Sequence, residues 1–410
     1  MIPYGRQDIS QSDIDSVVEV LRSDFLTQGP MVPRFEHAVA QYCGAQHAVA
    51  VNSATSALHI ACLALGVGPG DWVWTSPNTF VASANCALYS GAGVDFVDID
   101  CHTYNMSVER LEEKLSHAKK KGCLPKVLIP VHFAGQPCDM STIYALSKDY
   151  GFRILEDASH AIGARYATTN GDRSPDADLL APKISRQDTD KSTVGSCAYS
   201  DITVFSFHPV KIITSGEGGM VTTNDETLAA RMRRLRSHGI TSDEALMQKR
   251  PKEEIWNYQQ IELGFNYRMT DIQAALGLSQ LTRLDEFVRC RHKIAKRYNE
   301  RLEKFPLIIP VQAKGIYSSY HLYPIRIEEY RCKRSQREVF DALREKGVAA
   351  NLHYIPVYRH PYYEALGFRA GKCPEAERFY SEAVSLPIYC GLESDVQDSV
   401  IGALVEILEL

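Results

Sequence analysis

One lysine stands where covalent chemistry would need it. The stretch 204–219 begins as an apolar predicted strand, carries Lys211 after Ser206 and His208, and ends in Gly-Glu-Gly-Gly. A lysine amine becomes a nucleophile when its pKa is lowered, and it then forms Schiff bases with carbonyl groups. A lone lysine beside a turn is far more often a solvated surface residue, so the assignment depends on the rest of the chain.

The segment after the predicted strand at 48–52 has the residues of a phosphate site. It reads Asn-Ser-Ala-Thr-Ser-Ala-Leu (52–58), with small hydroxyl residues at the start of a predicted helix. Backbone N–H groups and the helix dipole attract anions at such a point. Ordinary N-capping by Ser53 or Thr55 explains the same residues equally well.

Phe80 and Asp157 also follow predicted strands. Phe80 comes after the strand at 71–75 and could stack on a flat cofactor, although a core position would suit it too. Asp157 leaves the strand at 152–156, where an acid could pair with the pyridinium nitrogen of pyridoxal phosphate. The alternative is that Asp157 caps the next helix. Because ligands bind at the carboxyl ends of parallel strands, these groups and Lys211 are expected to meet.

Helices and strands alternate along the first half of the chain, and this order would bring the strand ends to one edge. The strands are short and apolar throughout, which is typical of a parallel sheet buried on both faces. The pattern predicts a doubly wound α/β domain. We expect helices at about 12–22, 33–43, 54–66, 79–90, 107–121, 139–150 and 225–237, and strands at 48–52, 71–75, 94–99, 126–132, 152–156, 202–206 and 220–223.

The pattern changes near Thr270, where Thr-Asp-Ile-Gln has the form of a capping box. A long helix is predicted from there to about residue 302, either continuous or broken past Leu281. We expect a large domain at 1–265 and a smaller α+β domain at 266–410 that includes the long helix. The polar stretch 167–194 is predicted to be an exposed loop that decorates the surface, and 240–256 a variable connection. The smaller domain should contain strands at 321–327 and 348–354 and helices at 334–346, after 374 and after 394.

Composition excludes several classes of protein. Of the 410 residues, 45% are hydrophobic and 23% charged, which is ordinary for a soluble globular chain. The net charge is −5 without a long basic run, which argues against nucleic acid as a partner. No apolar run approaches a membrane span, and the eleven cysteines have no metal-ligand spacing. We expect a cytoplasmic protein without metal, membrane or nucleic-acid partners.

The strand-end groups occur together with further motifs, and the whole set resembles the sugar aminotransferases of the DegT/DnrJ/EryC1/StrS family. The resemblance implies the fold-type I, aspartate aminotransferase-like architecture, with pyridoxal phosphate as cofactor and a homodimer whose active sites are shared. The matching motifs span nearly the whole chain: Thr27-Gln-Gly-Pro, Asn52-Ser-Ala-Thr-Ser-Ala-Leu, Glu156-Asp-Ala-Ser-His-Ala-Ile-Gly, Phe205-Ser-Phe-His-Pro-Val-Lys, Gly216-Glu-Gly-Gly, Arg236-Ser-His-Gly and Gly264-Phe-Asn-Tyr-Arg-Met-Thr-Asp.

The resemblance implies a role for each matching residue. Lys211 would carry the cofactor as a Schiff base and move the proton, and Asp157 would bind the pyridine nitrogen. Phe80 would stack on the ring, with His160 near the ring hydroxyl. Ala54, Thr55 and Ser206 would hold the phosphate, and Asn266 (with or without Arg268) would reach across the subunit interface. The residues implied to contact the nucleotide sugar are Tyr4, Asp24, Phe25, Leu26, Thr27, Ala54, Ser206, Asn266, Asn351, Leu352, His353 and Tyr354.

Within the family, the chain most resembles the transaminases of pseudaminic acid synthesis, on Tyr4 and the segments 24–29, 237–240 and 351–356. This implies transfer of an amino group from L-glutamate to C4 of a UDP-4-keto-6-deoxy-N-acetylhexosamine. One alternative is another nucleotide 4-ketosugar, such as a D-configured UDP sugar or GDP-4-keto-6-deoxymannose. A dehydratase of this fold would replace Lys211 with histidine. A further alternative is a non-catalytic regulator on this fold. Such a protein would lack the visible absorbance that the Schiff base with the cofactor gives.

Overall fold

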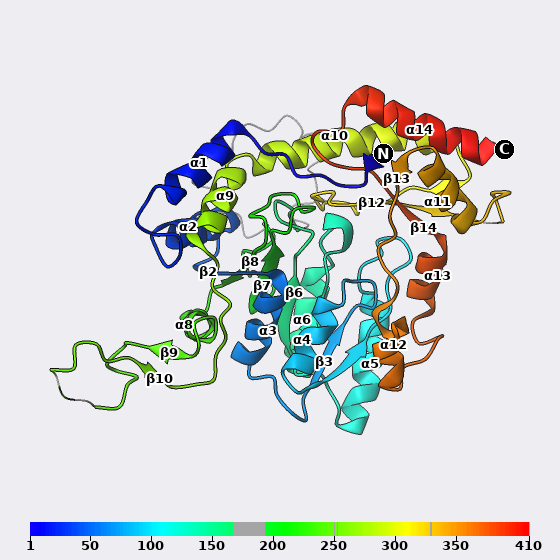
Figure 1. The fold of residues 1–410 in the computed structure, drawn as a ribbon. Coiled ribbons are helices and arrows are strands. Elements are labelled where there is room, and N and C mark those ends of the chain that lie inside the picture. Colours follow the sequence, from blue (N-terminus) through cyan, green and yellow to red (C-terminus); the bar gives the residue numbers. More distant parts are fainter. Residues whose placement is uncertain (167–192, 250, 252, 329, 410) are drawn as a thin grey trace.

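A mostly parallel seven-stranded sheet forms the centre of the larger part of the protein (Figure 1). The computed structural model describes residues 1–166, 193–249, 251, 253–328 and 330–409, so nearly all of the loop predicted at 167–194 lies outside the described residues. The strand order is β2-β8-β7-β6-β5-β3-β4, and β8 alone runs antiparallel to its neighbours. The strands are β2 (His47–Val51), β3 (Trp72–Thr75), β4 (Gly93–Phe96), β5 (Val127–Ile129), β6 (Arg153–Asp157), β7 (Ile202–Ser206) and β8 (Gly219–Thr223).

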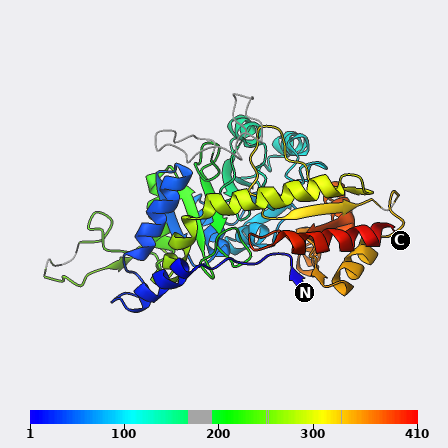
Figure 2. The ribbon, with the colours of Figure 1, turned by 90° about the horizontal axis from the view of Figure 1, so that it is seen from above.

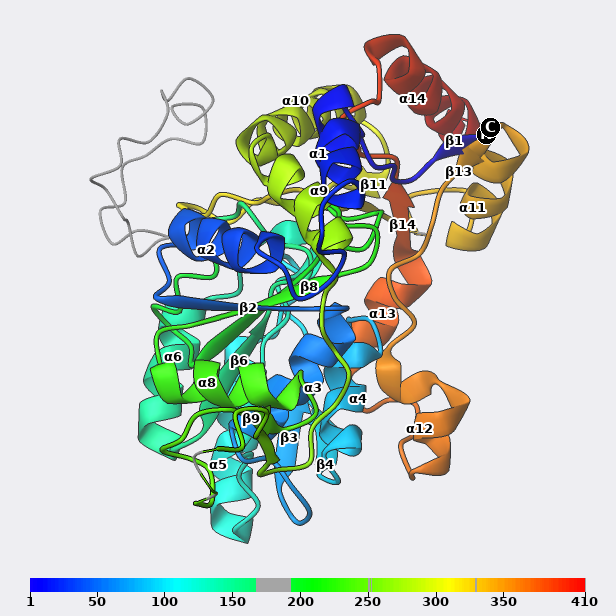
Figure 3. The same cartoon turned by 60° about the vertical axis from the view of Figure 1, so that its left-hand side comes forward.

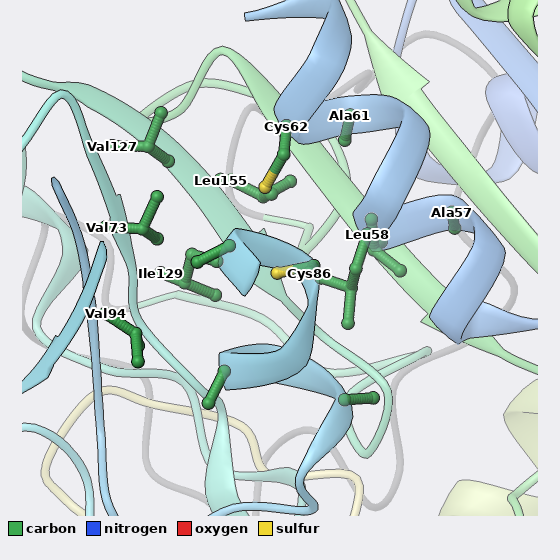
Figure 4. Close-up of a cluster of buried hydrophobic side chains, with 14 of the residues drawn as sticks. Ala57, Leu58, Ala61, Cys62, Val73, Cys86, Val94, Val127, Ile129 and Leu155 are labelled. Carbon is green, nitrogen blue, oxygen red and sulfur yellow. The ribbon is translucent and has the colours of Figure 1, made fainter. Parts of the chain in front are cut away.

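Helices cover both faces of this sheet, because successive apolar residues of each strand point to opposite sides. On β5, Val127 and Ile129 pack with α3, α4 and α8, whereas Leu128 packs with α2, α5, α6 and α9. Figure 4 shows the first of these clusters, with Cys62 of α3 facing Leu155 of the sheet. The helices of this part are α1 (Gln11–Leu21), α2 (Met31–Cys43), α3 (Ala54–Ala64), α4 (Ala82–Tyr89), α5 (Val108–Lys121), η1 (Phe133–Gly135), α6 (Met140–Tyr150) and α8 (Glu226–Leu235).

Several element boundaries differ from those predicted. Strand β5 ends at Ile129 instead of 132, because Pro130 has no N–H to continue the ladder. The connection at 240–256 is one side of an arm in which β9 (Ile240–Thr241) pairs with β10 (Gln259–Gln260). Figures 1 and 2 show this arm extending away from the body of the molecule.

The long helix predicted from Thr270 is broken after Leu281. Thr270 and Gln273 form the predicted capping box at the start of α9 (Asp271–Leu281), and α10 (Leu284–Leu302) continues beyond the break. Helix α10 packs with α11, α14 and a three-stranded antiparallel sheet, β11-β12-β14. The elements of this part are β11 (Leu307–Ile308), β12 (Tyr323–Ile327), α11 (Gln336–Glu345), β13 (Val348–Ala349), η2 (Val357–Arg359), α12 (Pro361–Ala365), α13 (Pro374–Glu382), β14 (Ala383–Leu386) and α14 (Ser394–Glu409).

The two ends of the chain are tied together through its N-terminal arm. Strand β1 (Ile2–Pro3) pairs in parallel with β13, so the arm crosses to the C-terminal elements, as Figure 3 shows. Conversely, Tyr363 of α12 and Phe379 of α13 are buried in the cluster that covers the large sheet. The division into domains at residue 265 stays a prediction.

One carboxylate holds the segment before α2 against the start of α9. Asp271 is fully buried, and its oxygens accept hydrogen bonds from the N–H groups of Gly29 and Met31, both at 2.7 Å. Helix α2 has no side-chain cap of its own, because Pro30 occupies its N-cap position. The N–H of Asp271 donates to the carbonyl of Leu26 at 3.0 Å. The predicted sugar-binding segment 24–27 is therefore fixed beside the segment 264–271.

Within the described residues, no helix is long and apolar enough to cross a membrane. The same part of the chain contains no group of three or more side chains arranged to hold a metal ion.

Candidate active site

Asp157 lies buried at the carboxyl end of β6. Its Oδ2 accepts a hydrogen bond from the hydroxyl of Ser83, and its Oδ1 accepts one from the N–H of Ser159 at 3.0 Å. The residues that follow, 158–166, form turns and the two isolated bridges of Arg165, without a helix. In this stretch there is no helix for Asp157 to cap, and its carboxylate is instead oriented by two donors.

Ser83, in the first turn of α4, and the polar residues just before that helix were missed by the sequence analysis. The hydroxyl of Ser83 is 2.8 Å from that of Thr79, which continues the hydrogen-bonded chain away from Asp157. Asn78 accepts a hydrogen bond from the N–H of Tyr354 at 3.3 Å. The only signal was the run of polar residues after β3. Phe80, in the same loop, is 61% exposed, so it is not a core residue.

Lys211 is half-buried in the loop that follows β7. Its N–H donates to the carbonyl of His208 at 2.9 Å, whereas its side-chain amine makes no hydrogen bond to any described residue. Burial lowers the pKa of the Lys211 amine to about 8, and the negative charge of Asp157 partly opposes this shift. A much larger fraction of the amine is therefore deprotonated at neutral pH than in an ordinary lysine, and this fraction can attack a carbonyl carbon.

Three histidines surround the lysine, and burial keeps all of them neutral. It lowers the pKa of His160 and of His321 well below the usual value and that of His353 to about 3, and the charge of Lys211 adds to each shift. The rings of His160 and His321 are 4.3 Å apart. The Nδ1 atoms of both are buried without a hydrogen-bond partner among the described residues. Such orphaned atoms indicate that a polar group from a ligand or water completes the site.

The start of α3 has the form of a phosphate cradle. Ser53 caps the helix by accepting from the N–H of Ser56 at 3.1 Å, as one alternative predicted. The N–H groups of Ala54 and Thr55 nevertheless remain without an acceptor among the described residues, as the first N–H groups of a helix do. Gly219 of β8 leaves this end open, because a Cβ there would lie 2.6 Å from the nitrogen of Ala54. These features fit the phosphate of pyridoxal phosphate.

The segments from the two ends of the chain form one wall beside these histidines. The Tyr354 hydroxyl is 3.1 Å from Nε2 of His160, and the ring of Tyr4 is 5.1 Å from that of His353. Asn351 accepts a hydrogen bond from the N–H of Leu352 at 2.8 Å. The predicted residues Tyr4 and 351–354 are therefore brought together with His160.

Other predicted residues lie apart from this cluster within the single chain. Asp24, Phe25, Leu26 and Thr27 are exposed, and none of them shares a hydrogen bond or ring contact with Asp157, His160 or Lys211. Asn266 is exposed as well. Its carbonyl accepts from the side chain of Asn52 at 3.5 Å, but its own side-chain amide bonds to no described residue. Ser206 accepts a long hydrogen bond, 3.5 Å, from the N–H of His208.

Comparison with known proteins identifies the family. The sequence profile of the DegT/DnrJ/EryC1/StrS aminotransferase family matches residues 7–405. The chain belongs to this family. The UDP-4-amino-4,6-dideoxy-N-acetyl-β-L-altrosamine transaminase of Campylobacter jejuni is 37% identical over 413 residues, covering 100% of this chain and 98% of that protein. The spore coat polysaccharide biosynthesis protein SpsC of Bacillus subtilis is 36% identical over 411 residues, with 100% and 97% covered.

Solved structures of DegT/DnrJ/EryC1/StrS aminotransferases share the whole fold. Helicobacter pylori PseC, an aminotransferase of pseudaminic acid biosynthesis, matches with a TM-score of 0.84 at 29% identity, covering 100% of this chain and 99% of that one. A putative sugar aminotransferase of Streptococcus pneumoniae, Spr1654, matches in its pyridoxamine phosphate form with a TM-score of 0.85 at 28% identity and the same coverage. The protein is a sugar aminotransferase of fold type I that depends on pyridoxal phosphate, which confirms the predicted fold class, enzyme class and cofactor.

We expect Lys211→Ala to abolish transamination while leaving the fold intact, because no other amine lies in the cluster of described residues around Asp157. Borohydride reduction of the wild-type protein loaded with pyridoxal phosphate should attach the cofactor at Lys211 alone, as peptide mass spectrometry would report. Lys126, whose amine pairs with Asp71 at 2.8 Å, offers a matched control that should keep full activity as alanine. Turnover by Lys211→Ala near the wild-type rate would refute the assignment.

Asp157→Asn should lose several orders of magnitude in turnover, because an amide cannot keep a pyridine nitrogen protonated. The variant should still fold, since the amide oxygen can accept from the N–H of Ser159 while the NH2 group donates to the hydroxyl oxygen of Ser83. Asp201→Asn is the control: Asp201 accepts from the N–H of Ile154 and pairs with Arg153, so its loss should lower stability and spare the specific activity. If Asp157→Asn behaves like Asp201→Asn, then Asp157 has only a structural role.

Proposed function

We propose that the protein transfers the amino group of L-glutamate to C4 of UDP-2-acetamido-2,6-dideoxy-β-L-arabino-hex-4-ulose. The product is UDP-4-amino-4,6-dideoxy-N-acetyl-β-L-altrosamine, for the synthesis of pseudaminic acid. The observation that carries the proposal is the match, over the full length of the chain, to two Campylobacter jejuni proteins named for this product. The likeness to Helicobacter pylori PseC supports the same substrate class. The eleven unpaired cysteines fit a reducing cytoplasm as the compartment.

The residues at the strand ends have different roles in this reaction. Pyridoxal phosphate, when bound, supplies the electron sink that lets an amino group pass between an amino acid and a ketone. Lys211 holds the cofactor at its carbonyl carbon and later moves a proton at Nζ, for which its lowered pKa is suited, since acid and base forms are both accessible near neutral pH. Asp157, oriented by Ser83 and Ser159, keeps the pyridine nitrogen protonated.

The remaining residues of the cluster bind and orient the cofactor and the nucleotide sugar. The free N–H groups of Ala54 and Thr55, with the hydroxyl of Ser206, hold the phosphate. Phe80, exposed at the mouth of the site, covers the ring. His160 donates from a neutral imidazole to the ring hydroxyl. The nucleotide sugar then lies against the wall made by Tyr4 and residues 351–354, with the segment 24–27 contributing from the loop that Asp271 fixes.

We further propose a homodimer in which each site contains residues from both chains. Asn266 supports this, because its exposed amide has no partner among the described residues and would supply the phosphate with a further donor. The arm formed by β9 and β10 supports it as well. Ile255, Trp256 and Leu263 are 90%, 73% and 79% exposed, and apolar side chains gathered in this way indicate a surface that a second chain covers.

A panel of nucleotide 4-ketosugars tests the substrate. Purified protein should show a kcat/KM at least about tenfold higher for the UDP-β-L-arabino sugar than for the D-configured UDP sugar or GDP-4-keto-6-deoxymannose, since the wall must distinguish polar groups of the sugar. The product is identified by mass and by NMR of C4. A higher kcat/KM for either alternative sugar would replace the proposed substrate and leave the aminotransferase assignment standing.

Mixing two inactive variants tests the shared site. Lys211→Ala and Asn266→Asp are purified separately and combined under conditions that let subunits exchange. Random exchange should restore about a quarter of the wild-type activity, because half of the dimers are mixed and each contains one intact site. Mixing Lys211→Ala with Asp157→Asn is the control, since both residues belong to one chain's half of the site and no intact site can form. Absence of recovery with Asn266→Asp, when exchange is confirmed by mass spectrometry, would mean that each site is built from one chain.

A further inference from the structure

Two cysteines, distant in sequence, lie against each other where α10 passes the segment 387–392. The sulfur of Cys290 on α10 is 3.5 Å from the carbonyl oxygen of Cys390. The sulfur of Cys390 is 3.4 Å from the carbonyl oxygen of Phe287, one turn earlier on α10. Each sulfur therefore packs against the other's segment. Both side chains are partly exposed, so a small solute can reach them.

A buried cation without a carboxylate partner stands beside this pair. Arg291 is 2% exposed, and its guanidinium donates to the carbonyls of Tyr320, His321 and Ile388. No described carboxylate forms an ion pair with it. A buried positive charge of this kind favours a negative charge on a neighbouring group.

The surroundings favour the thiolate form of Cys290. The hydrogen bond from Cys390 lowers the pKa of Cys290 to about 7; burial opposes this, whereas the charges of Arg291 and Lys293 lower it further and that of Glu286 raises it. The hydrogen bond with Cys290 and then burial raise the pKa of Cys390, although Arg291 acts against them and Asp8 adds to them. The pair thus combines a thiol that ionises more readily than usual with an adjacent thiol that keeps its proton. A redox-sensitive cysteine and its resolving partner have this arrangement.

We propose that Cys290 and Cys390 form a peroxide-reactive dithiol that closes reversibly to an intramolecular disulfide. The thiolate of Cys290 attacks one oxygen of hydrogen peroxide, the O–O bond breaks, and the products are Cys290 sulfenic acid and, after one proton is taken up, water. The sulfur of Cys390 then attacks the sulfenic sulfur, the S–S bond forms, and the S–OH oxygen leaves as a second water with the thiol proton. The two sulfurs lose two electrons in total, and the peroxide gains them.

A second pair of neighbouring cysteines provides the contrast. Cys62 on α3 and Cys86 on α4 lie in the core beneath the sheet, as Figure 4 shows, and both are 0% exposed. The hydrogen bond with Cys62, and then burial, raises the pKa of Cys86 well above its usual value. These two cysteines are also neighbours, but both side chains are fully buried, so peroxide has no path to them. This pair should stay reduced where Cys290 and Cys390 react.

The test exposes the holoenzyme to hydrogen peroxide at pH 7, blocks remaining thiols with N-ethylmaleimide and maps peptides without reduction. The protein should lose two of its eleven thiols, yield a peptide linking Cys290 to Cys390, and recover both thiols with dithiothreitol. Because the pKa of Cys290 is lowered, a larger fraction of it is thiolate at pH 7 than the few per cent of a free cysteine. Its lower intrinsic nucleophilicity offsets part of that gain, so Cys290 should react several-fold faster than the partly exposed Cys101 and Cys123.

Serine variants separate the two steps. In Cys390→Ser the link cannot form, and dimedone should trap Cys290 as its sulfenic acid. In Cys290→Ser, Cys390 should remain reduced at the same dose, whereas Cys101→Ser should form the link as the wild type does. The proposal is overturned if Cys101 or Cys123 is oxidised while no linked peptide appears. Linkage of Cys62 to Cys86 at the same dose, or oxidation of Cys390 in Cys290→Ser, would overturn it as well.

Discussion

The candidate active site depends on the placement of one buried carboxylate, that of Asp157, near one partly buried amine, that of Lys211. Asp157 ends β6 and Lys211 follows β7, and these strands are parallel neighbours in which Asp157 pairs with Val204. Their carboxyl ends consequently open on the same edge of the sheet. Burial alone would lower the pKa of the lysine further, and the charge of Asp157 limits the shift to about 8. Together, burial and the charge of Asp157 give an amine that can react at neutral pH and that is not a buried cation without a nearby negative charge.

The opposite face of the same strand holds this arrangement in place. Glu156 is fully buried and accepts hydrogen bonds from Nε2 of His132 at 2.7 Å, the hydroxyl of Tyr166 at 2.6 Å and that of Thr203 at 3.0 Å. Nδ1 of His132 is paired with the N–H of Cys138 at 3.1 Å, and Nε2 carries the proton that Glu156 accepts. Thr203 belongs to β7, so the network joins the two strands that carry the reactive groups. A buried network with every member satisfied fixes geometry in this way.

Whether a feature could be predicted from the sequence depends on how far apart in the chain its interacting residues lie. The positions of Asp157 and Lys211 at the ends of their strands and the capping box at Thr270 could be predicted, because each depends on residues close in the chain. Ser83, which orients Asp157, and His321, whose ring lies 4.3 Å from that of His160, could not, because their partners are 74 and 161 positions away and only the tertiary fold brings them together. The cap that Asp271 gives to α2 is hidden for the same reason. Helix limits shifted by a few residues where turns or prolines intervened.

The central claim is that Lys211 bonds the cofactor within this strand-end cluster, and the visible spectrum tests it most directly. Wild-type protein incubated with pyridoxal phosphate and then desalted should keep a visible absorbance band. L-glutamate should remove that band and 2-oxoglutarate should restore it, because the amino group moves onto the cofactor and back. The contradicting result is a desalted wild-type protein without visible absorbance, or a band that L-glutamate leaves unchanged.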